Sequence, residues 1–135
     1  MKDNVFIDTN ILLYLYSSSE HDKKEIIKNI INSNEIIISL QVVNEFCNVC
    51  FKKFKYSVEI IEISIKDFEK NFKIYDYSLK EIKNSLFIKN KYSYSFYDSL
   101  IISSSLSSNC KILYSEDMQH NQIIENKLKI INPFV

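Results

Sequence analysis

The chain has 135 residues, which is enough for one domain over residues 1–135 and leaves little room for a second. Hydrophobic residues make up 46% and charged residues 25%, the normal balance of a soluble globular fold. The 17 basic residues, all Lys, cancel the 17 acidic residues, so phosphate contacts would come from point-charge Lys side chains and not from bidentate Arg forks.

The chain begins without a signal-peptide pattern, because the apolar run after Asn4 is short and is broken by Asp8. The longest apolar stretches, such as Glu35–Val43, are too short to cross a bilayer. Three Cys without an obvious disulfide framework indicate a reducing compartment. We therefore expect a cytoplasmic protein.

The first half of the chain alternates short apolar runs with helical patterns. Asn4–Ile7 is predicted to be a buried strand and Ile11–Tyr16 a helix. Ser19 and Asp22 form a capping-box pattern at the start of a helix over Asp22–Ile31. Four Ile residues form the predicted inner stripe of that helix: Ile26, Ile27, Ile30 and Ile31. A second buried strand, Ile36–Ile38, leads to Ser39, which is expected to cap a helix from about Val42 to Lys55.

The second half is richer in helices. Val58–Phe68 is amphipathic, Phe72–Tyr75 is a weak strand, and Ser78 with Glu81 is expected to cap a helix that ends near Asn90. Ser95 and Asp98 form the same capping pattern before a helix over Tyr97–Ser108. Two last strands are expected at Lys111–Tyr114 and Leu128–Ile131. Strands that alternate with helices predict an α/β fold with a mostly parallel sheet of four or five strands, covered on both faces.

Four carboxylates occupy equivalent places in this pattern. Asp8 directly follows the first strand, and Glu45 lies in the first turn of the helix after the second strand. Asp98 lies in a first helical turn, and Asp117 follows the strand Lys111–Tyr114 after two intervening residues. The carboxyl ends of parallel strands and the following helix N-termini share one edge of an open sheet, where ligands bind. We therefore expect the four acids to point into one crevice.

Like charges that gather in one crevice repel one another unless a cation neutralises them. Oxygen ligands alone suit a hard ion, Mg²⁺ or Mn²⁺, and such an ion can promote phosphodiester hydrolysis. Each acid also has a purely structural explanation, because Asp8 and Asp98 can cap helices and Glu45 can complement a helix dipole. A metal site accounts better for four acids at one edge.

Four segments resemble the motifs of PIN-domain nucleases, in the order expected for that family. Phe6–Tyr14 is similar to the opening motif, and Gln41–Phe46 to the second. Ser95–Ile101 resembles the third motif, and Ile112–His120 the fourth, in the form of many bacterial toxin-like members. The resemblance runs from Asn4 to Phe134; the first and third motifs are fairly specific, and the second is weak alone.

The resemblance implies a three-layer α/β/α PIN-like fold and a metal-dependent ribonuclease. Asp8, Glu45, Asp98 and Asp117 would then form the catalytic and metal-binding set. Thr9 and Ser115 would hydrogen-bond these carboxylates, and Asn10 would orient Asp8. Glu116 is ambiguous because it neighbours Asp117, which is the preferred candidate.

Many small bacterial members of this family are VapC-type toxins held inactive by an antitoxin. For this chain the resemblance therefore implies the toxin component of a type II toxin–antitoxin pair, with a small antitoxin protein, an RNA substrate and a homodimer. An apolar groove for the antitoxin is expected between Ile11–Tyr16 and Val42–Phe54, with Tyr14, Tyr16 and Phe51 as outer aromatics.

The fourth motif departs from the family at one point. Relatives with this ending usually carry His-Gly-Gln, whereas this chain has His120-Asn121-Gln122. Asn is the best substitute for Gly in a left-handed turn, so the turn is expected to survive. His120 could approach a substrate, but a loop His is more often merely exposed.

Three other clusters have both a functional and a structural interpretation. The CxxC of Cys47 and Cys50 lies inside a predicted helix, which favours packing over redox or zinc chemistry. A basic and aromatic cluster at residues 51–56 could face RNA, although a solvated helix face is the simpler interpretation. The aromatic residues before Asp98 could stack bases or pack in the core; they are Tyr92, Tyr94, Phe96 and Tyr97.

Two alternatives to the nuclease hypothesis remain at this stage. A haloacid-dehalogenase-like phosphatase also begins with a strand followed by Asp, but it needs a second acid two residues later, where this chain has Asn10. A catalytically inactive PIN-like RNA-binding module would keep the fold without the chemistry, and the intact acids argue against it.

Overall fold

The computed structural model describes residues 2–135. Its centre is a six-stranded sheet in the order β3-β2-β1-β4-β6-β5. All neighbouring pairs are parallel except β5 and β6, which form an antiparallel hairpin. The strands are β1 (Asn4–Ile7), β2 (Glu35–Ser39), β3 (Lys73–Tyr75), β4 (Ile112–Tyr114), β5 (Ile123–Ile124) and β6 (Leu128–Ile131).

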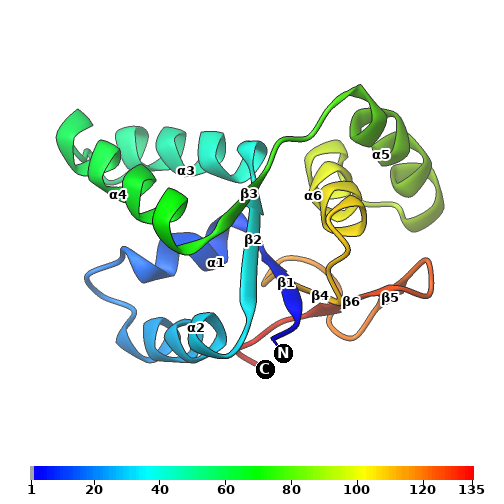
Figure 1. Cartoon of the computed structure of the whole chain (residues 1–135), viewed down its shortest axis with the longest axis horizontal. Helices are drawn as coiled ribbons and strands as arrows, with labels where there is room; N and C mark the ends of the chain where they lie inside the picture. Colours follow the sequence, from blue (N-terminus) through cyan, green and yellow to red (C-terminus); the bar gives the residue numbers. More distant parts are fainter. Residues whose placement is uncertain (1) are drawn as a thin grey trace.

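Six helices flank the sheet in the described part of the chain. They are α1 (Thr9–Leu15), α2 (His21–Ser33), α3 (Leu40–Lys52), α4 (Val58–Asn71), α5 (Leu79–Tyr92) and α6 (Phe96–Ser107). Figure 1 shows α1 and α2 on one side of the sheet and α5 and α6 on the other. The predicted α/β fold is confirmed, with one strand more than expected because β5 has only two residues.

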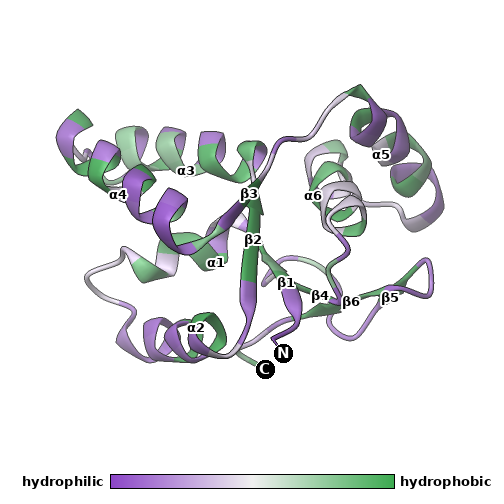
Figure 2. Ribbon diagram, viewed as in Figure 1, coloured by the Kyte–Doolittle hydropathy of each residue, from purple (hydrophilic) through white to green (hydrophobic). Residues whose placement is uncertain are grey.

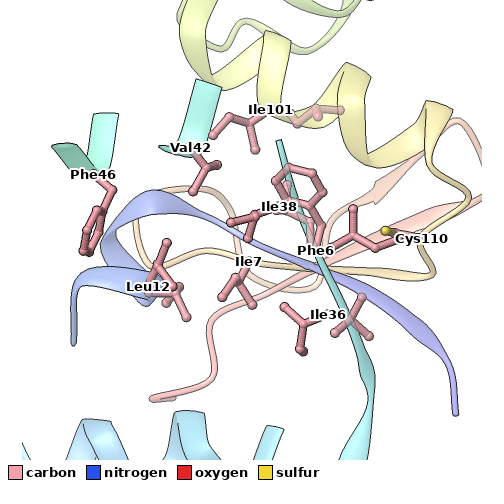
Figure 3. Close-up of a cluster of buried hydrophobic side chains, with 14 of the residues drawn as sticks. Phe6, Ile7, Leu12, Ile36, Ile38, Val42, Phe46, Ile101 and Cys110 are labelled. Atoms are coloured by element: carbon pink, nitrogen blue, oxygen red, sulfur yellow. The ribbon is translucent and has the colours of Figure 1, made fainter. Parts of the chain in front are cut away.

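The central strands β1 and β2 are apolar and buried after their first residues, because helices cover both of their faces. Phe6 pairs with Ile37 of β2 on one side and with Leu113 of β4 on the other, and all three side chains are almost fully buried. Figure 3 shows how neighbouring β1 residues diverge: Phe6 lies toward Ile101 of α6, whereas Ile7 lies on the side of Leu12. Figure 2 shows β2 as hydrophobic beyond its start, whereas most of α2 is hydrophilic.

Serine caps set most of the helix starts that the sequence predicts. The Ser39 hydroxyl accepts a hydrogen bond from the Val42 amide, and the Ser78 amide donates to the Glu81 carboxylate at 2.8 Å. The predicted capping box of Ser19 is wrong, because α2 begins at His21 after Glu20 and has no side-chain cap. The predicted stripe of α2 is narrower than expected, since Ile27 is fully buried while Ile26 is 37% exposed.

The β5–β6 hairpin was not predicted because its turn carries no glycine. Glu125 and Asn126 both have positive φ, 51° and 55°, as a tight hairpin turn requires. Tyr92 holds this turn: its hydroxyl accepts from the Glu125 amide at 3.0 Å and donates to the Glu125 carboxylate at 2.7 Å. Within residues 2–135, no helix is long and apolar enough to span a membrane.

Candidate metal centre

Asp8 lies at the carboxyl end of β1 and also caps α1, so its position is fixed by both elements. Its side chain is 7% exposed, with Oδ1 accepting from the Thr9 amide at 2.7 Å and Oδ2 accepting from the Ser115 hydroxyl at 2.9 Å. Burial nevertheless raises the pKa of Asp8 to about 7, and the charges of Asp98 and Glu45 add to that increase. Asp8 is thus a cap with an unusually costly negative charge.

Glu45 reaches the same place from α3. Its carboxylate accepts a hydrogen bond from the Thr9 hydroxyl at 2.9 Å, so Thr9 joins Asp8 to Glu45 through its amide and its hydroxyl. Burial raises the pKa of Glu45, as does the charge of Asp98. The predicted location in the first turn of the helix is wrong, because α3 begins at Leu40 and places Glu45 in the second turn.

Asp98 and Asp117 complete the acidic cluster, which we define as Asp8, Glu45, Asp98 and Asp117. The Asp98 amide donates to the capping hydroxyl of Ser95 at 3.2 Å, which places the carboxylate in the first turn of α6. Burial raises the pKa of Asp98, and the charge of Asp117 raises it further. Asp117 is exposed and accepts a hydrogen bond from the Asn10 side chain at 2.7 Å, so Asn10 contacts Asp117 where contact with Asp8 was expected.

Glu116 has hydrogen-bond partners of its own, outside the four acids of the cluster. Its carboxylate accepts from the Tyr14 hydroxyl at 2.6 Å and from the Lys23 ammonium at 2.8 Å. The Lys23 ammonium also lies 4.5 Å from the centre of the Tyr14 ring. Hydrogen bonds from Lys23 and Tyr14 lower the pKa of Glu116, which therefore stays charged. The role of Glu116 was ambiguous in the sequence, and no local pattern predicts its contacts with Tyr14 and Lys23.

The His120-Asn121 segment has a structural role. His120 is half-buried, and its Nδ1 accepts a hydrogen bond from the Asn132 amide at 2.9 Å. Asn121 has a φ of 70°, so the predicted left-handed turn is present. His120 therefore supports the loop after β4.

No positive charge compensates the acidic cluster within the described residues. The four ion pairs of residues 2–135 join other acids to Lys23, Lys28, Lys91 and Lys111. As the side chains stand, no three His, Cys, Asp or Glu residues in that range are arranged to hold a metal ion. The donor set is nevertheless all oxygen and its charges raise one another's pKa values, so its chemistry fits a hard divalent cation.

The cysteines pack in the interior. Cys50 is buried and Cys47 is half-buried within α3, and burial raises the pKa of both thiols, that of Cys50 to about 11. A thiol with a raised pKa is a poor nucleophile and a poor metal ligand. The expected packing role is therefore favoured over redox or zinc chemistry.

The aromatic residues before Asp98 divide into two groups. The hydroxyl groups of Tyr92 and Tyr94 hold residues 119–125, with Tyr94 accepting from the Gln119 amide at 3.1 Å. Tyr97, by contrast, is 64% exposed and packs edge-on against Phe96, with ring centres 5.3 Å apart. Of these four aromatic residues, Tyr97 is the one whose ring is exposed enough to meet a ligand.

A groove of about 500 Å³ lies between α1 and the end of α3. It is lined by Asn10, Leu13, Tyr14, Ser17, Ser19, Glu20, Val49, Lys53 and Phe54. Two of the three expected outer aromatics do not line it. Tyr16 packs against Phe46 and Phe68 in the interior, and Phe51 is 45% exposed but lies outside the groove.

The family model of the PIN domain matches residues 5–125. The fold is also similar to solved structures of toxins. VapC20 of Mycobacterium tuberculosis, a sarcin-ricin-loop-cleaving toxin, is 14% identical over 84% of this chain and 89% of that chain, with a TM-score of 0.69. A toxin–antitoxin complex from Klebsiella pneumoniae is 20% identical over 96% of this chain and 97% of that chain (TM-score 0.70), and DNA-bound VapBC from Salmonella typhimurium is 17% identical over 95% and 96% (TM-score 0.65). A sequence comparison with curated proteins found no match. The family match covers far more than half of the chain and includes all four segments that resemble the motifs; the chain belongs to the PIN domain family.

Proposed function

We propose that this protein is a metal-dependent ribonuclease whose acidic cluster holds Mg²⁺ or Mn²⁺. The observation that carries the proposal is an uncompensated group of acids from four separate segments, in which Thr9 joins Asp8 to Glu45 and Asn10 holds Asp117. A phosphatase of the haloacid-dehalogenase type is disfavoured, since position 10 is an amide engaged with Asp117 and the chain is a PIN domain.

Each residue of the cluster has a distinct task in this mechanism. Asp8 and Asp98 would bind the ion directly or through water, with Glu45 beside them and Asp117 completing the site. When bound, the ion supplies Lewis-acid activation of water and charge stabilisation at the phosphodiester. Thr9 and Ser115 orient the carboxylates by donating hydrogen bonds, which leaves the remaining oxygen lone pairs free for ligands.

Asp98→Asn separates a capping role from a metal-binding role. The cap rests on the Asp98 amide and the Ser95 hydroxyl, both of which the variant keeps. The melting temperature should therefore stay near that of the wild type while cleavage of a mixed RNA substrate is lost. A variant that cuts RNA at the wild-type rate would show that Asp98 serves only the helix.

Metal binding has its own readout in thermal stability. A ligand that binds only the folded state raises the melting temperature by mass action, so Mn²⁺ or Mg²⁺ should stabilise the wild type. The Asp8→Asn variant should lose most of that increase. If millimolar metal leaves both melting curves unchanged, the protein is an inactive PIN-like module and the ribonuclease proposal fails.

We further propose that the protein is the toxin of a type II toxin–antitoxin pair, acts as a homodimer in the cytoplasm and is inhibited by a small antitoxin protein. The groove between α1 and α3 supports this proposal, because Asn10 lines it and also contacts Asp117. An antitoxin tail in the groove could thus place a basic side chain on the acidic cluster. Leu13, Tyr14 and Phe54 would supply its apolar contacts.

Induced expression in a bacterial host tests the toxin role. Growth should stop with the wild type and continue with Asp8→Asn, and co-expression of the protein encoded beside it should restore growth. Harmless expression of soluble, nuclease-competent protein would reject the toxin role and leave the ribonuclease proposal intact.

A further inference from the structure

A second cleft, of about 370 Å³, adjoins the acidic cluster on the side of α3 and α6. We call it the amide–tyrosine cleft; it is lined by Gln41, Asn44, Glu45, Asn48, Tyr77 and Tyr97. Its size lies within the range of roughly 300–1,000 Å³ that is usual for ligand pockets. Apart from Glu45, the lining consists of neutral amides and phenol rings, so it suits a planar, uncharged group with hydrogen-bonding edges rather than a phosphate.

Gln41 forms part of the wall of this cleft and holds it together from within. Its side chain is 4% exposed, and its Nε2 donates to the Tyr97 carbonyl at 3.0 Å. Because a carbonyl can only accept, this bond fixes the amide orientation and leaves Oε1 as the free acceptor. Among residues 2–135, Oε1 has no hydrogen-bond partner. Because Oε1 is itself buried, the hydrogen-bonding groups that the cleft presents to a ligand are the exposed amides of Asn44 and Asn48.

Tyr97 supplies the flat surface. Its ring is 64% exposed, whereas the hydroxyl groups of Tyr92 and Tyr94 are occupied by the loop that follows β4. An exposed tyrosine beside neutral amides is a typical site for stacking a base, because every base has a π-face. Glu45 belongs both to this cleft and to the acidic cluster, which connects a base in the cleft with chemistry at its neighbouring phosphate.

We propose that the amide–tyrosine cleft binds one unpaired nucleobase of the RNA, stacked on Tyr97, with adenine preferred. Side-chain amides place a donor beside an acceptor, which matches the N6 amino group and a ring nitrogen of adenine. A base in a duplex has its edge paired and cannot enter, so the cleft would select single-stranded RNA. This inference rests on the proposed ribonuclease function and adds a specificity determinant to it.

The first test uses nucleosides, which carry no phosphate and are not repelled by the acidic cluster. Adenosine and uridine are titrated in chelator and followed by heteronuclear NMR shifts. Adenosine should shift resonances of residues 41–48 and bind more tightly than uridine. Tyr97→Ala should weaken adenosine binding by roughly tenfold, and Tyr97→Phe, which keeps the ring, should retain it. The control Phe87→Ala removes another exposed aromatic side chain, on α5, and should change nothing.

The second test measures cleavage of RNA with a single variable base. Tyr97→Ala should raise KM with kcat nearly unchanged and should reduce the preference for adenine. Asn48→Ala should reduce that preference while stacking remains. Nucleoside binding without RNA cleavage would reject the ribonuclease and keep the cleft. Cleavage with an unchanged KM and base preference in Tyr97→Ala, or equal failure of both nucleosides to bind, would overturn the cleft proposal.

Discussion

Replacing Asp8 by Asn should stabilise the protein in the absence of metal. Asp8 is deeply buried, and its pKa rises from 3.8 to about 7 chiefly because burial disfavours the charged form. The asparagine is nearly isosteric. Its Oδ1 can still accept from the Thr9 amide, and its amino group can donate to the Ser115 hydroxyl, which can rotate. The substitution therefore removes the buried charge, keeps the hydrogen bond from Thr9 and reverses the direction of the one with Ser115.

The magnitude follows from the two pKa values. A carboxyl group with a higher pKa in the folded state binds protons more tightly there, so folding is favoured below pH 3.8 and this advantage disappears as pH rises to about 7. At roughly 1.4 kcal/mol per pH unit, the free energy of unfolding falls by about 4 kcal/mol between these two pH values. Above pH 7 the wild type should be less stable than Asp8→Asn by up to that amount, and near pH 4 the two should agree.

Urea unfolding in chelator across this pH range measures the difference directly. Asp76→Asn, which changes an exposed acid between β3 and α5, is the control and should follow the wild type. Added Mn²⁺ should raise the stability of the wild type and not that of Asp8→Asn, because at position 8 only the carboxylate offers a charged ligand. Parallel pH profiles of wild type and Asp8→Asn would refute the assignment of a strained buried charge to Asp8.

Three further substitutions test the supports of the site. Lys23→Met should lower the melting temperature and speed amide hydrogen exchange at residues 115–117, because it removes the ion pair that ties this loop to α2, whereas Lys24→Met should do neither. Asn121→Val should cost roughly 1–2 kcal/mol in urea unfolding, since its φ of 70° suits Asn and disfavours a β-branched residue, while Asn121→Gly should be tolerated. Phe46→Ala should cost about 3–5 kcal/mol because Phe46 is 1% exposed, and Phe51→Ala, at 45% exposure, should cost far less, by the same measurement.

The elements with strong local signals could be predicted from the sequence. The apolar run Asn4–Ile7 is the strand it indicates, and Ser39, Ser78 and Ser95 all cap helices, because both features depend on neighbours within a few residues. The β5–β6 hairpin could not be predicted, because its turn uses Glu125 and Asn126 in a conformation usually signalled by glycine.

The partners of the site residues were harder to predict than the site itself. The placement of Asp8 at a strand end and of Asp98 at a helix start follows from the pattern of elements, whereas Glu45 lies one turn further into α3 than predicted. Tyr14 and Glu116 are 102 residues apart in the chain, and Gln41 binds a carbonyl 56 residues away. Such contacts depend on side-chain directions in short loops, and no local pattern encodes them.

The three residues after β4 connect two members of the acidic cluster to each other. Ser115 donates to Asp8, Glu116 accepts from Tyr14, and Asp117 accepts from Asn10, so consecutive loop residues all bind α1 or its cap. Asp8 and Asp117 are therefore held as one unit. Glu45 and Asp98 lie half-exposed on separate helices and take no part in these loop contacts; the Glu45 carboxylate accepts from Thr9. Among residues 2–135 no three ligands are in place as the side chains stand, so the proposed ion would require the acids on α3 and α6 to turn toward Asp8 and Asp117. Loss of the α1–loop contacts should then weaken metal binding even where all four carboxylates are intact.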